Sequence, residues 1–329
     1  MKRINGLFEK VCAFDSLMLA YKKARRGTRK SEEASQFFFR TEQELFKLQE
    51  LLRTETYRPG AYRYFEINDP KHRIIAVAPF CDRVVHHAVV AVLEPIFEAT
   101  FIHDSYATRK NKGVHKAVFQ AQKYLRKNQW YLKADINKFF DSVDIHILMT
   151  IISRKVKDNR LMRLIQRILE NGSKNGIGLP IGNLTSQFFA NVYLNQFDYF
   201  VKQHLRVPDY VRYMDDFVLF MPEKQDLKSV LPRLSCFLED NLKLKLKPES
   251  IRLHPAMHGL PFLGLRIFGQ MLRFLPENSR RIRIKLSNKM ADFEAGTISE
   301  KVFLDSMNSY NAHLTVFHTR ALRTQLFGI

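Results

Sequence analysis

The stretch Val211-Arg212-Tyr213-Met214-Asp215-Asp216-Phe217-Val218-Leu219-Phe220 places two adjacent carboxylates between two apolar runs. Apolar and β-branched runs of this length predict buried strands, so the aspartates are expected at the turn of a hairpin. Two like charges held side by side repel each other unless a cation offsets them, and for oxygen ligands that cation is magnesium or manganese. A solvated Asp-Asp turn is the alternative on this stretch alone.

A second predicted strand carries a third carboxylate. Residues 130–136 are apolar except for Lys133 and end in Asp135-Ile136. A buried carboxylate without a partner is costly, so Asp135 needs one. If this strand lies beside the 211–220 hairpin in one sheet, the three aspartates converge and could hold two cations about 4 Å apart. The predicted catalytic residues are Asp135, Asp215 and Asp216, and the predicted metal site comprises Asp135, Ile136, Asp215 and Asp216.

Charge indicates the partner. The chain has 329 residues, enough for two or three lobes, with 53 Lys and Arg against 33 Asp and Glu and a formal net charge of +20. Such an excess favours a polyanion, and contacts to phosphates would make binding depend steeply on salt. The basic residues are spread among 27 Phe and 12 Tyr rather than gathered on one amphipathic helix, which argues against a membrane partner.

Three features that the sequence lacks indicate the cellular compartment. No apolar run approaches the roughly 20 residues that span a bilayer, and the first residues lack the apolar core of a signal peptide. The three cysteines, Cys12, Cys81 and Cys236, are far apart and form no Cys-x-x-Cys pair. We therefore expect a cytoplasmic protein without a structural zinc site.

Residues before Asp135 suggest two contacts to phosphate. Lys71 and Arg73 follow a turn at 68–70 and occupy alternate positions of a strand, so both side chains share one face. They are either solvated edge charges or a pair that grips a triphosphate. Further along, the polar loop 105–113 is rich in basic residues and leads into a helix, which suits a nucleic-acid backbone.

The chain after Asp135 alternates helices with short strands. A glycine-rich loop at 171–182 leads into a long helix from about Thr185 to His204. Residues 262–274 predict a hairpin that turns at Gly269-Gln270. Basic residues dominate from Asn278 to Lys289, and this shift is the candidate boundary of a separate lobe that grips nucleic acid.

In order, these features resemble the reverse transcriptases over nearly the whole chain. Lys71 and Arg73 resemble the fingers residues, 134–140 the first catalytic motif, 178–183 the template-side loop, 213–216 the catalytic box and 262–264 the primer grip. The resemblance implies an α+β, right-hand polymerase with fingers, an antiparallel palm sheet and a helical thumb. It divides the chain into an N-terminal helical extension (1–60), fingers and palm (61–273) and thumb (274–329). The fingers would take about 61–130 and 145–185, and the palm about 131–144 and 186–273.

The template-side loop indicates a subtype. The run Ile181-Gly182-Asn183-Leu184-Thr185-Ser186-Gln187 is similar to the reverse transcriptases of diversity-generating retroelements. Those enzymes copy the structured RNA of their own element into cDNA with errors at adenines, and they act with a small helical-bundle accessory protein. One alternative is a retron or group II intron-type enzyme, but most of these relatives carry Gln where this chain has Ile181 and Ser-Pro where it has Ser186-Gln187. The other is an inactive RNA-binding scaffold, against which the three aspartates argue.

The resemblance also assigns the remaining site residues. Phe140 would be the steric gate that excludes a ribose 2′-hydroxyl, with Phe139 in the core. The predicted nucleotide-binding residues are Lys71, Arg73, Phe140, Ile181, Gln187 and Tyr213. The predicted nucleic-acid-binding residues are Arg109, Lys110, Lys112, Gly182, Asn183, Leu263, Gly264, Arg280, Arg281, Arg283 and Lys285. Template RNA, a cDNA primer and dNTPs are the implied partners, and Mg²⁺ is the implied cofactor, with Mn²⁺ as the alternative.

One expected residue is missing. Relatives usually place a lysine, a candidate general acid, where this chain has Ser250. Lys245 and Lys247 are the candidates to substitute for it, and the acid stays unassigned.

Overall fold

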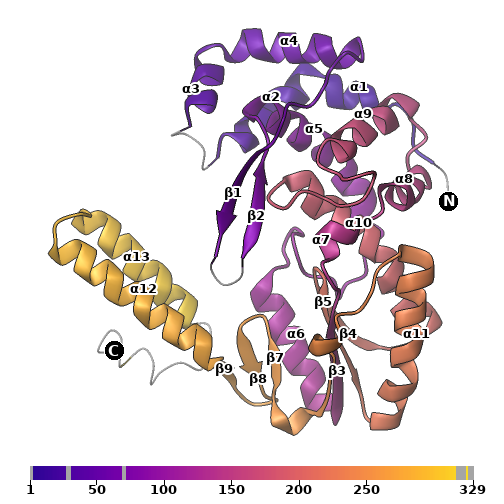
Figure 1. Ribbon diagram of the computed structural model, residues 1–329, viewed down its shortest axis with the longest axis vertical. Coiled ribbons are helices and arrows are strands. Elements are labelled where there is room, and N and C mark those ends of the chain that lie inside the picture. Colours follow the sequence, from indigo (N-terminus) through magenta and orange to yellow (C-terminus); the bar gives the residue numbers. More distant parts are fainter. Residues whose placement is uncertain (1–2, 27–30, 69–71, 316–323, 325–329) are drawn as a thin grey trace.

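The computed structural model describes residues 3–26, 31–68, 72–315 and 324 (Figure 1). The helices are α1 (Leu7–Cys12), α2 (Phe14–Ala24), α3 (Glu32–Phe39), α4 (Thr41–Arg53), α5 (Phe80–Glu98), α6 (Val114–Lys127), α7 (Phe139–Ser142), α8 (Ile145–Ser153), α9 (Asn159–Glu170), α10 (Leu184–Tyr199), α11 (Lys224–Leu242), α12 (Pro276–Glu294) and α13 (Glu300–Thr315). The strands are β1 (Arg63–Ile67), β2 (Arg73–Val77), β3 (Trp130–Asp135), β4 (Asp209–Tyr213), β5 (Asp216–Met221), β6 (Arg252–Pro255), β7 (Leu260–Phe262), β8 (Leu265–Ile267) and β9 (Leu272–Phe274).

A four-stranded antiparallel sheet in the order β4-β5-β3-β6 lies at the centre of the chain. The predicted hairpin forms β4 and β5, and its turn contains Asp215. The 130–135 strand pairs with β5 in a register that sets Asp135 opposite Asp216. The prediction that the third carboxylate lies beside the hairpin in one sheet is therefore confirmed.

The two faces of this sheet pack against different cores. Leu132 and Phe217 point into the larger core with α10 and α11, whereas Tyr131 and Val218 point into a smaller one with α6 and the β7-β8-β9 sheet. Directly opposed residues of an antiparallel pair share a face. Asp135 and Asp216 therefore lie on the α6 face, at the end of the sheet where the apolar packing stops.

The two ends of the chain form helical groups that lie away from the central sheet (Figure 1). The expected N-terminal helices α1–α4 pack together and against α5. The β1-β2 hairpin extends from these helices beside the loop that precedes α10. At the other end, α12 and α13 form a helical hairpin that leaves the small β7-β8-β9 sheet. This is the α+β arrangement that the sequence predicts.

Two further elements match their predictions. The long helix after the glycine-rich loop is α10, which continues as a π-helix over Phe200–His204. The strands β8 and β9 form the expected hairpin, closed by a bond from the Phe268 N–H to the Met271 carbonyl at 2.9 Å. Among the described residues, no helix has both the length and the apolar character that a membrane span requires.

The glycine-rich loop ends by packing against β2. The Ala76 N–H donates to the Ile181 carbonyl at 2.8 Å, and the Asn183 side-chain amide donates to the Ala76 carbonyl at 3.2 Å. Gly182 lies between these two bonds with φ +111, and an added Cβ would meet Ile75 Cγ2 at 2.7 Å. The loop thereby fixes the β1-β2 hairpin to the start of α10, and only glycine fits at this position.

Replacing Gly182 by alanine is expected to lower the free energy of unfolding by about 2–3 kcal/mol, because it adds a steric clash to an unfavourable φ. Gly176 is the matched control: its φ is +77, but an added Cβ would meet nothing within 4 Å. Gly176→Ala should cost only about 1 kcal/mol. Urea unfolding of both variants measures the difference, and equal losses would contradict the clash at Gly182.

Candidate active site

Three aspartates meet where β3 ends and the β4-β5 turn begins. Asp135 is the last residue of β3, Asp216 is the first of β5, and Asp215 lies in the turn. Each carboxylate is partly or largely shielded from solvent, since the apolar strands behind it belong to the two cores. Neighbouring strand ends thus concentrate negative charge at one edge of the sheet.

Repulsion between the carboxylates is visible in the pKa of Asp215. Burial, followed by the charge of Asp135 and with a smaller contribution from Asp216, raises the pKa of Asp215 to about 7. The Asp135 Oδ1 atom is buried and has no hydrogen-bond partner in the part of the chain that the structure describes. A divalent cation between Asp135 and Asp215 would supply both the missing partner and the missing counter-charge. These two carboxylates therefore fit a metal ion.

Asp216 has a cationic partner within the site. Its Oδ1 lies 2.7 Å from the Lys133 Nζ, and the Lys133 side chain is only 15% exposed. Lys133 and Asp135 are two residues apart on β3 and share a face, so the lysine lies within reach of the carboxylates. Within the described ranges, no trio of His, Cys, Asp or Glu side chains is arranged to hold a metal. The structure brings Asp135 and Asp215 together and gives Asp216 a cationic partner.

The backbone around Asp135 is held by residues 245–250. Ile136 forms an isolated bridge with Leu246, and the two hydrogen bonds that flank it use the carbonyls of Asp135 and Lys245. The Ile136 carbonyl takes part in neither of these two bonds, and its role as a metal ligand stays a prediction. The Ser250 Oγ accepts the Asp135 N–H at 3.0 Å and donates to the Lys247 carbonyl at 2.7 Å. Ser250 thus fixes the β3 end, and its contacts are those of a structural residue rather than of an acid.

Two of the predicted nucleotide-binding residues lie at a cavity of about 1040 Å³ between the β1-β2 hairpin and the glycine-rich loop. Arg73 and Ile181 both line it, whereas Lys71 lies outside the described residues. Phe140 is partly exposed and its carbonyl accepts the Leu179 N–H at 2.7 Å, while Phe139 is buried in the core as expected.

Two other predicted nucleotide-binding residues take positions at element ends. Tyr213 is the last residue of β4 and pairs with Asp216, and burial raises the pKa of its hydroxyl. Gln187 lies in the first turns of α10, where its N–H donates to the Asn183 carbonyl at 3.2 Å. Gly182 and Asn183, which we expected to contact nucleic acid, make the contacts to β2 described above.

Arg109 does not behave as predicted. Its side chain is 6% exposed, and it donates two hydrogen bonds from Nε and Nη2 to Glu98 Oε1, at 3.0 and 2.7 Å. Its Nη1 donates to the carbonyls of Ile102 and Ser105. The guanidinium is therefore used to shape the basic loop, and the expectation that it contacts a template backbone has no support. Lys110 is exposed, whereas Lys112 is half-buried and its Nζ donates to the His103 carbonyl at 2.7 Å.

The predicted primer-side residues lie together. Leu263 and Gly264 form the β7-β8 turn, with φ +49 and +83. The Asn278 side chain on α12 donates to the Gly264 carbonyl at 2.8 Å, so the turn and the helical hairpin are joined. Arg281 and Lys285 line a cavity of about 250 Å³ beside this turn. Arg280 and Arg283 lie on the same helix, α12.

Sequence reasoning missed three residues that shape the site: Lys133, Ser250 as an anchor, and Arg212. Lys133 and Arg212 had a detectable signal, because each is a charged residue inside a strand whose neighbours are apolar. A charge in such a position requires a partner. The sequence did not identify the partners. Asp216 pairs with Lys133 and Asp198 pairs with Arg212 only because the tertiary fold brings them together.

Comparison with known families agrees with this geometry. The family model described as reverse transcriptase (RNA-dependent DNA polymerase) matches residues 67–267, which contain the sheet, the three aspartates and the glycine-rich loop. The chain belongs to the reverse transcriptase family, and its enzyme class is RNA-directed DNA polymerase.

Curated relatives are similar at modest identity. The chain is 25% identical over 277 residues to protein YkfC of Escherichia coli K12, covering 70% of this chain and 73% of that protein. It is 24% identical over 299 residues to the group II intron-encoded protein LtrA of Lactococcus lactis subsp. cremoris, covering 69% of this chain and 50% of LtrA. The chain therefore spans about half the length of this second relative.

Solved structures with a similar fold include two of telomerase from Candida tropicalis. The complex with a TWJ fragment of telomeric RNA has a TM-score of 0.52 at 13% identity, covering 85% of this chain and 58% of that one. The apo structure has a TM-score of 0.51 at 14% identity, with 66% and 49% covered. At these identities the likeness concerns the fold, and it agrees with the right-hand polymerase architecture.

Replacing Asp215 by asparagine is expected to stabilise the metal-free protein by at least about 1 kcal/mol, because it removes one of two crowded charges. Free Mg²⁺ at 100 times its Kd should stabilise the wild-type protein by about 2.7 kcal/mol and should leave Asp215→Asn unchanged. Thermal unfolding in EDTA and in Mg²⁺ measures both effects. Asp305→Asn, at an exposed position on α13, is the control. Equal Mg²⁺ stabilisation of all three proteins would exclude a site at Asp215.

Proposed function

We propose that the protein copies the template RNA of a diversity-generating retroelement into cDNA, with errors directed to template adenines. The proximity of the Asp135 carboxylate at the end of β3 to the Asp215 carboxylate in the β4-β5 turn carries the polymerase part of this proposal. The loop from Ile181 to Gln187 supports the subtype. The proposed division keeps an extension at 1–60, fingers and palm at 61–273 and a thumb at 274–329.

Each side chain has a defined task in the proposed reaction. Asp135 and Asp215, with the Ile136 carbonyl, would hold Mg²⁺, and Mn²⁺ is the alternative ion. When bound, the metal supplies activation of the primer hydroxyl and neutralisation of the triphosphate. Lys133 keeps Asp216 in place at 2.7 Å. Arg73, on the cavity wall with Lys71 before it in sequence, would bind the triphosphate.

Nucleic acid would run between the basic loop and α12. Lys110 and Lys112 would contact the template backbone, and the Leu263-Gly264 turn would support the primer end. Arg280, Arg281, Arg283 and Lys285 lie on one helix and would contact the duplex backbone. Binding should weaken steeply with salt, as expected for a chain of net charge +20. A small helical-bundle accessory protein is the proposed protein partner.

Ile181 provides a physical reason for infidelity. A glutamine at this position can hydrogen-bond to nucleotide or template and fix its position, whereas isoleucine neither donates nor accepts. Ile181 lines the cavity with Arg73, and its backbone carbonyl accepts a hydrogen bond from the Ala76 N–H. The side chain can therefore contact the nascent base pair only through van der Waals packing, without a hydrogen bond, so the geometry of that pair is less constrained.

A group II intron-type reverse transcriptase is the second candidate. The relatives favour it, because LtrA is a group II intron-encoded protein with 24% identity over 299 residues. In such an enzyme, errors would not concentrate at adenines.

The deciding experiment is primer extension on an RNA template with the four dNTPs, followed by sequencing of the cDNA. Wild-type protein should extend the primer and misincorporate preferentially opposite adenine, and Asp215→Ala should be inactive. Ile181→Gln should lower errors opposite adenine by about 10-fold, since one hydrogen bond of about 1.4 kcal/mol would be restored.

Ile177→Gln is the matched control, because Ile177 lines the same cavity and lies in the same glycine-rich loop. It should leave the error pattern unchanged. Extension with uniformly low errors would favour the intron-type enzyme, and a folded wild-type protein that extends no primer would support the inactive scaffold. An Ile181→Gln enzyme with unchanged adenine errors would reject the role assigned to Ile181.

A further inference from the structure

Beneath the catalytic turn, an arginine and an aspartate are completely buried. Arg212 lies on β4 and Asp198 on α10, and both side chains are 0% exposed. The Arg212 Nε and Nη2 donate to the two carboxylate oxygens of Asp198 at 2.7 and 2.6 Å, which is the bidentate geometry of a guanidinium-carboxylate pair. The Tyr210 hydroxyl donates to the same carboxylate at 2.9 Å.

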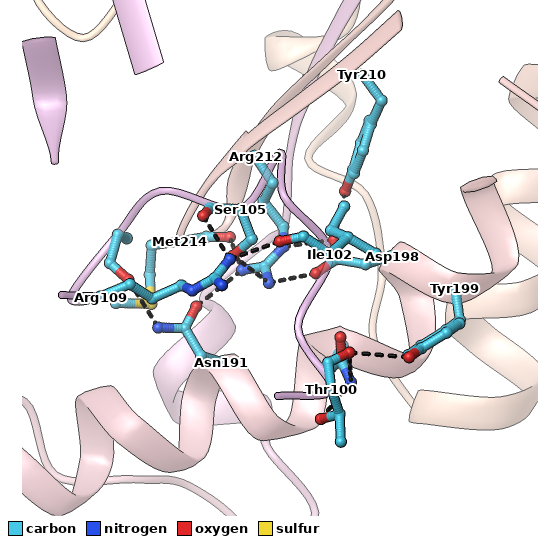
Figure 2. Close-up of polar contacts among 12 residues, drawn as sticks. Thr100, Ile102, Ser105, Arg109, Asn191, Asp198, Tyr199, Tyr210, Arg212 and Met214 are labelled. Atoms are coloured by element: carbon cyan, nitrogen blue, oxygen red, sulfur yellow. Dashed lines mark hydrogen bonds and ion pairs between the residues drawn. The ribbon is translucent and has the colours of Figure 1, made fainter. Parts of the chain in front are cut away.

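The third nitrogen of this guanidinium reaches the turn itself. The Arg212 Nη1 donates to the Met214 carbonyl at 3.0 Å and to the Asn191 Oδ1 at 3.2 Å. Nη2 also donates to the Ser105 Oγ at 3.0 Å. Figure 2 shows this guanidinium between the 102–109 loop, α10 and the start of the turn. One side chain therefore connects three segments that are distant in sequence.

Met214 has a conformation that needs support. Its φ is +57, a left-handed value that costs about 1 kcal/mol or more for a residue with a side chain. The peptide that Arg212 holds by its carbonyl is the one that leads directly into Asp215. A change in the orientation of this peptide would move the Asp215 carboxylate relative to Asp135.

We propose that Arg212 is a positioning residue, which holds the Met214 carbonyl so that the Asp215 carboxylate stays aligned with Asp135, while Asp198 fixes the guanidinium. This inference rests on the proposed function, since it assumes that Asp215 takes part in polymerisation. Arg212 touches neither substrate nor metal in this role. It acts through the backbone of the turn.

The fork geometry explains why the residue is arginine. A guanidinium can bind both oxygens of Asp198 with one edge and still direct Nη1 at the carbonyl. A lysine ammonium has no rigid fork, so it can satisfy the carboxylate or the turn, but not both in this geometry. A buried ion pair contributes little to stability compared with an apolar pair of similar size, so stability alone does not account for this pair.

The test removes both charges together. Arg212→Met with Asp198→Asn leaves no unpaired buried charge and keeps an acceptor for Tyr210, so its melting temperature should stay within about 4 °C of the wild-type value. The single-turnover rate of nucleotide addition at saturating dNTP should fall about 100-fold. The dNTP concentration for half-maximal rate should change by less than about threefold. A single-turnover rate does not depend on the fraction of folded enzyme.

A matched pair controls for the loss of an ion pair in the same region. Lys202, in the π-helix that continues α10, lies 2.8 Å from Asp104, which precedes Ser105 in the loop. Neither side chain contacts the Met214 carbonyl. The variant Lys202→Met with Asp104→Asn should keep the single-turnover rate within about twofold of wild type.

Arg212→Lys separates geometry from charge, because it keeps a cation beside Asp198 and loses the fork. It should remain slow by about 100-fold. A rate equal to that of wild type in Arg212→Lys, or in a folded double variant, overturns the positioning role. If the double variant does not fold, Arg212→Lys alone decides. A wild-type protein that extends no primer is a failure of the proposed function instead.

Discussion

Repulsion between Asp135 and Asp215 is the constraint on which the site depends. The two carboxylates are brought together by the register of β3 on β5 and by the short turn between β4 and β5. Burial and the charge of Asp135 raise the pKa of Asp215 to about 7, so the fold maintains a cluster of negative charge that is unfavourable without a cation. The surrounding residues hold this cluster in place rather than relieve the repulsion.

Each carboxylate has its own support. Ser250 holds the backbone of Asp135, Lys133 pairs with the side chain of Asp216, and Arg212 holds the peptide that leads into Asp215. The supports come from three directions: the segment before β6, the strand β3 itself, and β4 against α10. Each of the three aspartates is therefore held by a different part of the fold.

The sequence predicted those parts of the fold whose signal is local. Continuous runs of apolar residues predicted β3, β4 and β5, and the pair of aspartates marked the turn. Partners that depend on the tertiary fold were not predictable in this way. Arg109 belongs to a basic loop, but Glu98, 11 residues earlier on α5, binds its guanidinium and removes it from the surface. The sequence likewise places Lys133 in a strand but does not indicate that Asp216 is its partner. The retroelement subtype rests on residues 181–187, and the positions of the aspartates do not discriminate between subtypes.

The central claim is that Asp135 and Asp215 form a cation site while Asp216 remains with Lys133. Crystals of the protein soaked in Mn²⁺ and measured at the manganese absorption edge test it directly, because the anomalous signal locates the ion without reference to activity. The account predicts an anomalous peak within coordination distance of both the Asp135 and the Asp215 carboxylates, with the Lys133 contact to Asp216 kept. The absence of a peak between these two carboxylates at saturating Mn²⁺ would contradict it.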